Sequence, residues 1–176
     1  PITIALDKAL TPSQNAQRYF KRYQKLKEAV KYLTELIEET KATILYLESV
    51  ETVLNQAGLE EIAEIREELI QTGFIRRRQR EKIQKRKKPE QYLASDGKTI
   101  IYVGRNNLQN EELTFKMARK EELWFHAKDI PGSHVVISGN LDPSDEVKTD
   151  AAELAAYFSK GRLSNLVQVD MTCLLY

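Results

Sequence analysis

The sequence is poor in the residues on which several common protein classes depend. A single cysteine, Cys173, stands among 176 residues, so an internal disulfide is excluded and a reducing compartment is favoured. No apolar run reaches membrane-spanning length, and no signal-peptide pattern is visible. Gly104 begins nothing resembling Gly-x-Gly-x-x-Gly, and no Gly-Lys-Ser/Thr occurs, so a phosphate-binding glycine loop is not predicted. Because the first residue is Pro1 rather than Met, we expect a fragment of a longer protein.

Charge is plentiful but unevenly distributed. Lys, Arg, Asp and Glu make up 30% of the residues, yet the net charge is only +1. Between Arg76 and Lys88, nine basic residues and one acidic residue give a net +8, which leaves −7 for the rest of the chain. This basic run has almost no apolar content and ends at Pro89, so we expect it on the surface, as helix or linker. Two roles stay open: a solvated hinge between two domains, or a patch that contacts phosphates with salt-dependent affinity.

A long helix is predicted from Tyr19 to Leu54. Thr11 and Pro12 open it as N-cap and first helical residue, and no Gly or Pro interrupts it. Its apolar residues are spaced alternately by four and three, which is typical of a coiled-coil seam held for about five heptads. At 1.5 Å per residue, such a helix is about 60 Å long. The seam consists of Tyr19, Tyr23, Leu26, Val30, Leu33, Ile37, Ile44 and Leu47.

An exposed apolar seam requires a partner helix. Asn55 to Gly58 resemble a helix C-cap and tight turn, and a second apolar stripe follows from Leu59 to Ile70. We therefore predict an antiparallel hairpin whose returning helix is clear only as far as Thr72. The alternative is a parallel homodimer through the first helix alone.

From Gln91 onward the periodicity changes to two, which is typical of strands. Asp96-Gly97 is a favoured hairpin turn pair, Asn110 is expected to cap a helix, and Gly161 is expected to end another. The expected elements are strands at 92–94 and 99–104, a helix after 110, strands at 123–127 and 134–138, a helix over 147–158 and a strand over 167–175.

Together these patterns predict an α+β protein, with a long antiparallel coiled-coil hairpin followed by a compact mixed α/β domain. The expected divisions are an N-terminal segment at 1–12, the hairpin at 13–75, a basic linker or helix extension at 76–90 and the α/β domain at 91–176, whose natural C-terminus is left open.

Two histidines lie near one turn of the α/β domain. Strand alternation places Trp124, His126 and Lys128 on one face, and His126 can meet His134 across the hairpin. One interpretation is a rigid turn whose histidines satisfy backbone groups. The other is a recognition surface that offers stacking and a cation to an RNA loop.

Catalytic or metal-binding uses of the same turn have weaker support. Asp129 and the two histidines, with Cys173 at an unknown distance, are a sparse ligand set for a metal. A triad of Ser133, a histidine and Asp129 can be written, but no oxyanion-hole motif accompanies it. We therefore predict binding without catalysis, no metal and no cofactor.

Several long motifs resemble one known family, the NFACT proteins. Two lie at 96–110: Asp96-Gly97, and Val103 to Asn107 with Gln109-Asn110. The run from Trp124 to Val135 completes the similarity to the NFACT-R domain, and Thr11 to Tyr23 resembles the start of the family's coiled-coil middle region. The resemblance covers essentially the whole chain. The arrangement of the chain is similar to the C-terminal half of the Gram-positive, fibronectin-binding members of the family.

This resemblance implies a function in ribosome quality control. Family members bind large ribosomal subunits that carry an obstructed peptidyl-tRNA, and bacterial members help to add C-terminal alanine tails. The coiled coil acts there as an arm across the ribosome, and NFACT-R is regarded as an RNA-binding module. Gram-positive relatives are also described as surface adhesins that bind fibronectin without an export signal.

The predicted partners are therefore the RNA of the large ribosomal subunit and tRNA, in the cytoplasm and without membrane insertion. The alternatives are fibronectin at the cell surface, and a second copy of the chain through the coiled coil. The candidate nucleic-acid-binding residues are Arg76, Arg77, Arg78, Arg80, Lys82, Lys85, Arg86, Lys87, Lys88, Arg105, Trp124, His126, Lys128 and His134.

Overall fold

The computed structural model describes residues 2–78 and 87–173. The chain divides into two compact units, Pro1–Ile44 and Leu45–Tyr176. Among the described residues, no helix is both long enough and apolar enough to cross a membrane.

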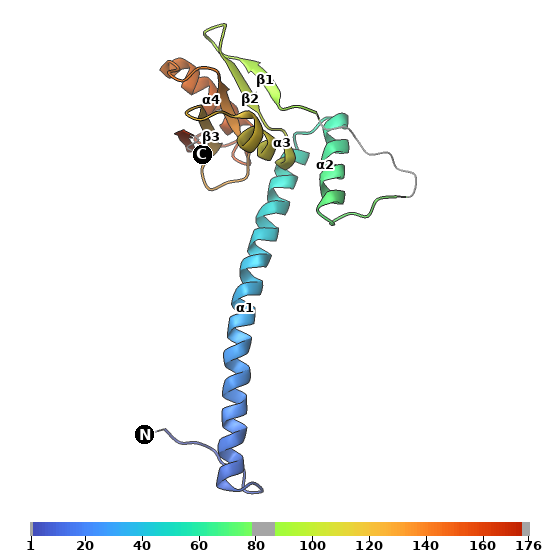
Figure 1. The fold of residues 1–176 in the computed structure, drawn as a ribbon, viewed down its shortest axis with the longest axis vertical. Helices are drawn as coiled ribbons and strands as arrows, with labels where there is room; N and C mark the ends of the chain where they lie inside the picture. The colour runs from blue at the N-terminus through green and yellow to red at the C-terminus, as the bar shows by residue number, and fades with distance from the viewer. Residues whose placement is uncertain (1, 79–86, 174–176) are drawn as a thin grey trace. The chain divides into compact units, whose positions relative to one another are not determined.

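The first unit consists of most of helix α1 (Pro12–Leu54) and the segment before it (Figure 1). The helix begins as predicted: the Thr11 hydroxyl accepts from the Gln14 amide at 3.3 Å, and the Gln14 side chain accepts from the Thr11 amide at 2.8 Å. This reciprocal pair is a capping box. Buried Asn15 then holds the preceding segment, since its Oδ1 accepts from the Asp7 amide at 2.9 Å.

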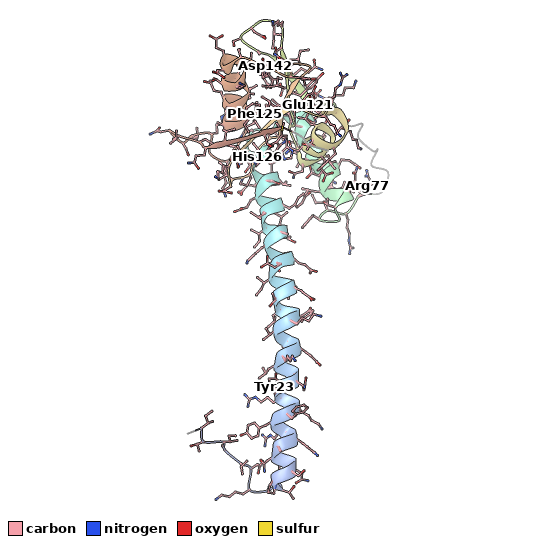
Figure 2. All side chains as sticks on the ribbon, turned by 60° about the vertical axis from the view of Figure 1, so that its left-hand side comes forward. Tyr23, Arg77, Glu121, Phe125, His126 and Asp142 are labelled. Carbon is pink, nitrogen blue, oxygen red and sulfur yellow. The ribbon has the colours of Figure 1, made fainter. Side chains whose placement is uncertain are left out.

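The seam of the first unit is exposed among the described residues. Tyr23, labelled in Figure 2, is 57% exposed, and Val30 is 64% exposed. Burial within this unit therefore contributes little to the helix, whose length rests on local propensity and the absence of Gly and Pro.

Helix α2 (Leu59–Gln71) returns after a short turn, so the predicted helical hairpin is confirmed. Ile65 packs against Val50 and Val53 in the last turns of α1. The Gly58 amide donates to Glu61 Oε2 at 2.6 Å, which fixes the start of α2. Because α2 has only 13 residues, these contacts involve only the end of the long helix.

Five antiparallel strands follow, in the spatial order β1-β2-β4-β3-β5. The predicted strands and the α+β class are confirmed. Helix α4 (Asp145–Tyr157) lies beside the sheet (Figure 1). Its Ala151 and Ala155 belong to a core shared with Phe125 and Val135. The strands are β1 (Glu90–Leu93), β2 (Ile100–Val103), β3 (Leu123–Ala127), β4 (Val135–Ser138) and β5 (Val169–Cys173).

The short helix between β2 and β3 begins earlier than predicted. Helix α3 (Asn107–Glu112) is capped by Asn106, whose side chain accepts from the Gln109 amide at 2.8 Å. The prediction of Asn110 as N-cap was wrong, because Asn110 lies inside the helix and its side chain bonds to residues near β4. A π-helical turn, η1 (Leu113–Met117), continues α3.

Candidate nucleic-acid interface

Three aromatic rings come together where β3 faces the start of β4. Alternation along β3 buries Phe125 in the core and turns Trp124 and His126 to the other face, as predicted. Phe125 and His126 are labelled in Figure 2. The register pairs Phe125 with Val135, which brings His126 opposite His134. The prediction that the two histidines meet is confirmed, since their ring centroids are 5.4 Å apart. We call Trp124, His126 and His134 the ring cluster.

The rings of the cluster pack mainly on one another. Trp124 is stacked on His126 at 5.6 Å with an interplanar angle of 17°, and meets His134 edge-on at 5.1 Å. All three residues are half-buried. The indole Nε1 of Trp124 is buried and has no hydrogen-bond partner among the residues that the structure describes. The cluster is thus a packed aromatic surface that retains one unused donor.

The π-helical turn fixes the orientation of His134. Buried Thr114 on η1 places its Oγ1 2.7 Å from His134 Nδ1, and the His134 amide donates to Asn110 Oδ1 at 2.9 Å. Single π-helical turns occur frequently at functional sites.

Both histidines are held in the neutral form. Burial and, to a smaller extent, the nearby His126 lower the pKa of His134 to about 4, although a backbone hydrogen bond with Asn110 acts in the opposite direction. Burial also lowers the pKa of His126, against the Gly132 backbone and the charge of Asp170. Near pH 7 the cluster therefore offers stacking and neutral hydrogen-bonding groups rather than positive charge.

Gly104 is required by the same arrangement. A Cβ at this position would lie 2.2 Å from Asn110 Oδ1, the atom that accepts from the His134 amide. The Gly104 amide also donates to the His134 carbonyl at 3.0 Å. Gly104 and Asn110 therefore position the ring cluster from behind, a role that their motifs alone did not predict.

Arg105 lies away from the ring cluster and is engaged within the chain. Its Nε is 3.1 Å from Glu61 Oε1 and 3.5 Å from Glu90 Oε2. Its guanidinium carbon lies 4.0 Å from the Phe158 ring centroid, and its side chain is only 11% exposed. In this conformation Arg105 ties α2 to the sheet, and its guanidinium is not presented to solvent as a phosphate contact would require.

The residues after Arg105 extend this attachment to the end of the helical hairpin, where α2 packs against the last turns of α1. Three carboxylates of α2, at 61, 64 and 68, follow a helical spacing that places them on one face. The sequence patterns did not predict that these carboxylates are complementary to the amide side chains that face them. The contacts are Asn106 and Gln109 to Glu64 Oε2 at 3.0 and 2.8 Å, and Asn107 to Glu68 Oε1 and Ser49 Oγ, both at 2.9 Å.

The basic run is described only at its two ends. Residues 76–78 and 87–88 have no regular secondary structure, and Arg76, Arg78, Lys87 and Lys88 are exposed. Arg77, labelled in Figure 2, pairs with buried Glu67, and Lys87 pairs with Glu60. The predicted residues Arg80, Lys82, Lys85 and Arg86 lie outside the described residues.

One more predicted site residue, Lys128, can be located. Lys128 is exposed one residue beyond β3, and its amide donates to the Gln168 carbonyl at 2.8 Å. Within residues 2–78 and 87–173, no group of three or more His, Cys, Asp or Glu side chains could hold a metal ion. The sparse ligand set considered for the turn therefore gains no support.

The second unit thus combines an antiparallel sheet backed by one helix with a neutral ring cluster and a basic run before β1, and stacking rings and cations are the groups that nucleic-acid-binding modules use. The chain belongs to the NFACT family: residues 1–88 match the NFACT N-terminal and middle domains, and residues 88–173 match the NFACT protein RNA binding domain.

Similar proteins agree with this assignment. The chain is 96% identical over 171 residues to a protein of Streptococcus pneumoniae named Rqc2 homolog RqcH, and 44% identical over 176 residues to the Bacillus subtilis protein of that name. Each alignment covers 97% of this chain, which spans about a third of the relatives' length, 31% and 30%.

A solved structure is also closely similar. It is the C-terminal part of the fibronectin/fibrinogen-binding protein from Streptococcus suis, with a TM-score of 0.88 and 80% identity. The similarity covers 94% of this chain and 66% of that one.

Proposed function

We propose that this chain is the ribosome- and RNA-contacting part of a ribosome quality control factor that recognises large subunits carrying peptidyl-tRNA. The observation that carries the proposal is the ring cluster, which lies inside the region matching the NFACT RNA binding domain. The name of the relatives, Rqc2 homolog RqcH, supports the ribosomal context and a cytoplasmic location.

The two parts of the proposed interface have different roles. The basic run supplies long-range attraction to phosphates and a salt-dependent share of the affinity. The neutral ring cluster supplies contacts to unstacked bases, and the buried indole N–H of Trp124 can donate to a base acceptor after a small ring movement. Exposed Lys128 adds a phosphate contact beside it.

The proposed activity is binding without catalysis. Ser133, a nucleophile considered for the turn, is buried, and its amide donates to the Phe158 carbonyl at 3.0 Å. Hydrolysis of a nucleotide, peptide or ester that is abolished by His126→Ala would contradict the proposal.

The direct test measures binding of the 176-residue chain to purified large ribosomal subunits. Trp124→Leu keeps a smaller apolar side chain but removes the stacking ring and the indole donor, so we expect binding to weaken by about tenfold. Leu141→Ala, at an exposed apolar position, is the matched control. Unchanged subunit binding by a folded Trp124→Leu variant would remove the ring cluster from the interface.

Fibronectin binding is a second candidate function, favoured by the description of the Streptococcus suis protein. The exposed apolar seam of α1 is the surface that would support a protein partner, and it would equally support pairing with a second copy of the chain. Such binding would be insensitive to Trp124→Leu and weakened by Val30→Asp. Sedimentation of the chain alone separates self-association from binding to fibronectin.

A further inference from the structure

A cleft separate from the ring cluster opens in the second unit between α2, β1 and the end of α4. Its volume is about 480 Å³, within the range of small-molecule sites. Its walls include Glu90 and Tyr92 from β1, Tyr157 from α4, and Phe158 and Arg162 from the segment that follows. Apart from Arg105, no residue that lines this cleft belongs to the sequence motifs or to the proposed interface.

One wall of the cleft alternates guanidinium groups with aromatic rings. The Arg162 guanidinium carbon lies 4.0 Å from the Tyr157 ring centroid, and Arg162 also donates to the Tyr157 hydroxyl. Tyr157 meets Phe158 edge-on at 4.8 Å, and Arg105 covers Phe158. Because Arg162 and Tyr157 are both exposed, they present a flat cationic surface on which a base can stack.

The cleft also contains an accessible carboxylate. The Glu90 side chain is 47% exposed, and its Oε2 lies 3.5 Å from Arg105 Nε, which leaves lone pairs on both oxygens. Beside it, burial, the charge of Glu90 and a side-chain hydrogen bond to Glu90 raise the pKa of Tyr92 to about 12, so this hydroxyl stays neutral and donates to one lone pair of the Glu90 carboxylate. An acceptor pair, a hydroxyl and a stacking surface therefore meet in one cleft.

We propose that this cleft binds a guanine nucleotide of single-stranded RNA. The base stacks on the Arg162–Tyr157 pair, and its N1–H and N2–H donate to the two oxygens of Glu90. Guanine alone among the four bases presents two adjacent donors on its Watson–Crick edge, which a bidentate carboxylate matches. The nucleotide's phosphate lies toward Arg162. That this nucleotide belongs to an RNA strand rests on the function proposed above.

The test titrates the full chain with GMP, AMP, CMP, UMP and inorganic phosphate, followed by calorimetry and amide chemical shifts. We expect GMP to bind about 5- to 140-fold more tightly than the other nucleotides, since a bidentate pair discriminates by about 1–3 kcal/mol. Glu90→Gln should abolish this preference. Tyr157→Ala should weaken the binding of all four nucleotides. Tyr157→Phe retains the stacking ring and should weaken their binding less. Glu146→Gln, at an exposed carboxylate of α4, is the control.

Three results would overturn the inference: GMP binding no tighter than AMP binding, full competition by inorganic phosphate, or a preference for GMP that survives Glu90→Gln. Each is distinguishable from failure of the proposed function, because large-subunit binding by the Trp124→Leu variant is measured separately. Absence of nucleotide binding together with intact subunit binding would contradict the proposal for the cleft and leave the proposed function standing.

Discussion

Thr114 and His134 are joined side chain to side chain by a 2.7 Å contact between Oγ1 and Nδ1. Thr114 belongs to the π-helical turn, and His134 comes just before β4, so the contact links two elements that are distant in sequence. The bond fixes the ring of His134 against Trp124 and His126. The orientation of the proposed recognition surface therefore depends on a residue outside the hairpin that carries it.

Removing the Thr114 hydroxyl should destabilise the protein more than the small size of this group suggests. Thr114→Val keeps the shape but leaves His134 Nδ1 half-buried without its partner, at a cost of about 1–3 kcal/mol. Urea unfolding measures the loss. Thr149→Val on the exposed face of α4, where the hydroxyl bonds to its own helix, is the matched control. Equal losses in both variants would show that the contact does not stabilise the fold.

Stability should fall with acidification through the window set by His134. Its pKa in the folded chain, about 4, lies below the ordinary value of 6.5, so the unfolded chain binds more protons between these values. The contribution of neutral His134 to the free energy of unfolding is complete above pH 6.5 and is lost as the pH falls toward 4. The loss is about 2 kcal/mol between pH 7 and 5.

Urea unfolding at several pH values measures this loss. His134→Gln should flatten the pH dependence of the unfolding free energy, although the variant is less stable at pH 7. His126→Gln should flatten it further, because burial lowers the pKa of His126 as well. A His134→Gln variant with the parent's full pH dependence would contradict the assignment.

Arg105 should prove important for stability rather than for RNA contact. Arg105→Gln removes the ion pairs to Glu61 and Glu90, and hydrogen bonds to charged groups contribute about 1.5–3 kcal/mol. Large-subunit affinity, measured where the variant is fully folded, should be unchanged. Arg119→Gln, at an exposed arginine, controls for lost charge. Weaker subunit binding without lost stability would return Arg105 to the interface.

The basic run should determine the salt dependence of RNA binding. Arg76→Glu combined with Lys88→Glu leaves the Arg77–Glu67 pair intact, which a reversal at Arg77 would disrupt. Each lost phosphate contact should reduce the log–log salt slope by about 0.7–0.9. The control reverses exposed Lys98 and Lys120 instead. Binding by the first variant that equals the parent at every salt concentration would make the run a solvated linker.

Local sequence patterns determined the secondary structure of this protein. The heptad spacing and the missing Gly and Pro predicted α1, and the period-two runs predicted the strands, because both signals depend on neighbouring residues. Alternation and a short turn also sufficed to predict that His126 meets His134. The cap at Asn106 was missed because Asn106 and Asn110 are equally plausible caps by residue type.

Tertiary structure alone decided which polar groups are engaged. By sequence, Arg105 is one more cation near a basic run, but folding places it between Glu61 and Glu90, whose positions in the chain give no sign of proximity. Thr114 and Gly104 likewise gain their roles from Asn110 and His134 across the fold. Periodicity records which side of an element is apolar, whereas the partner of a buried charge or hydroxyl depends on how separate elements pack.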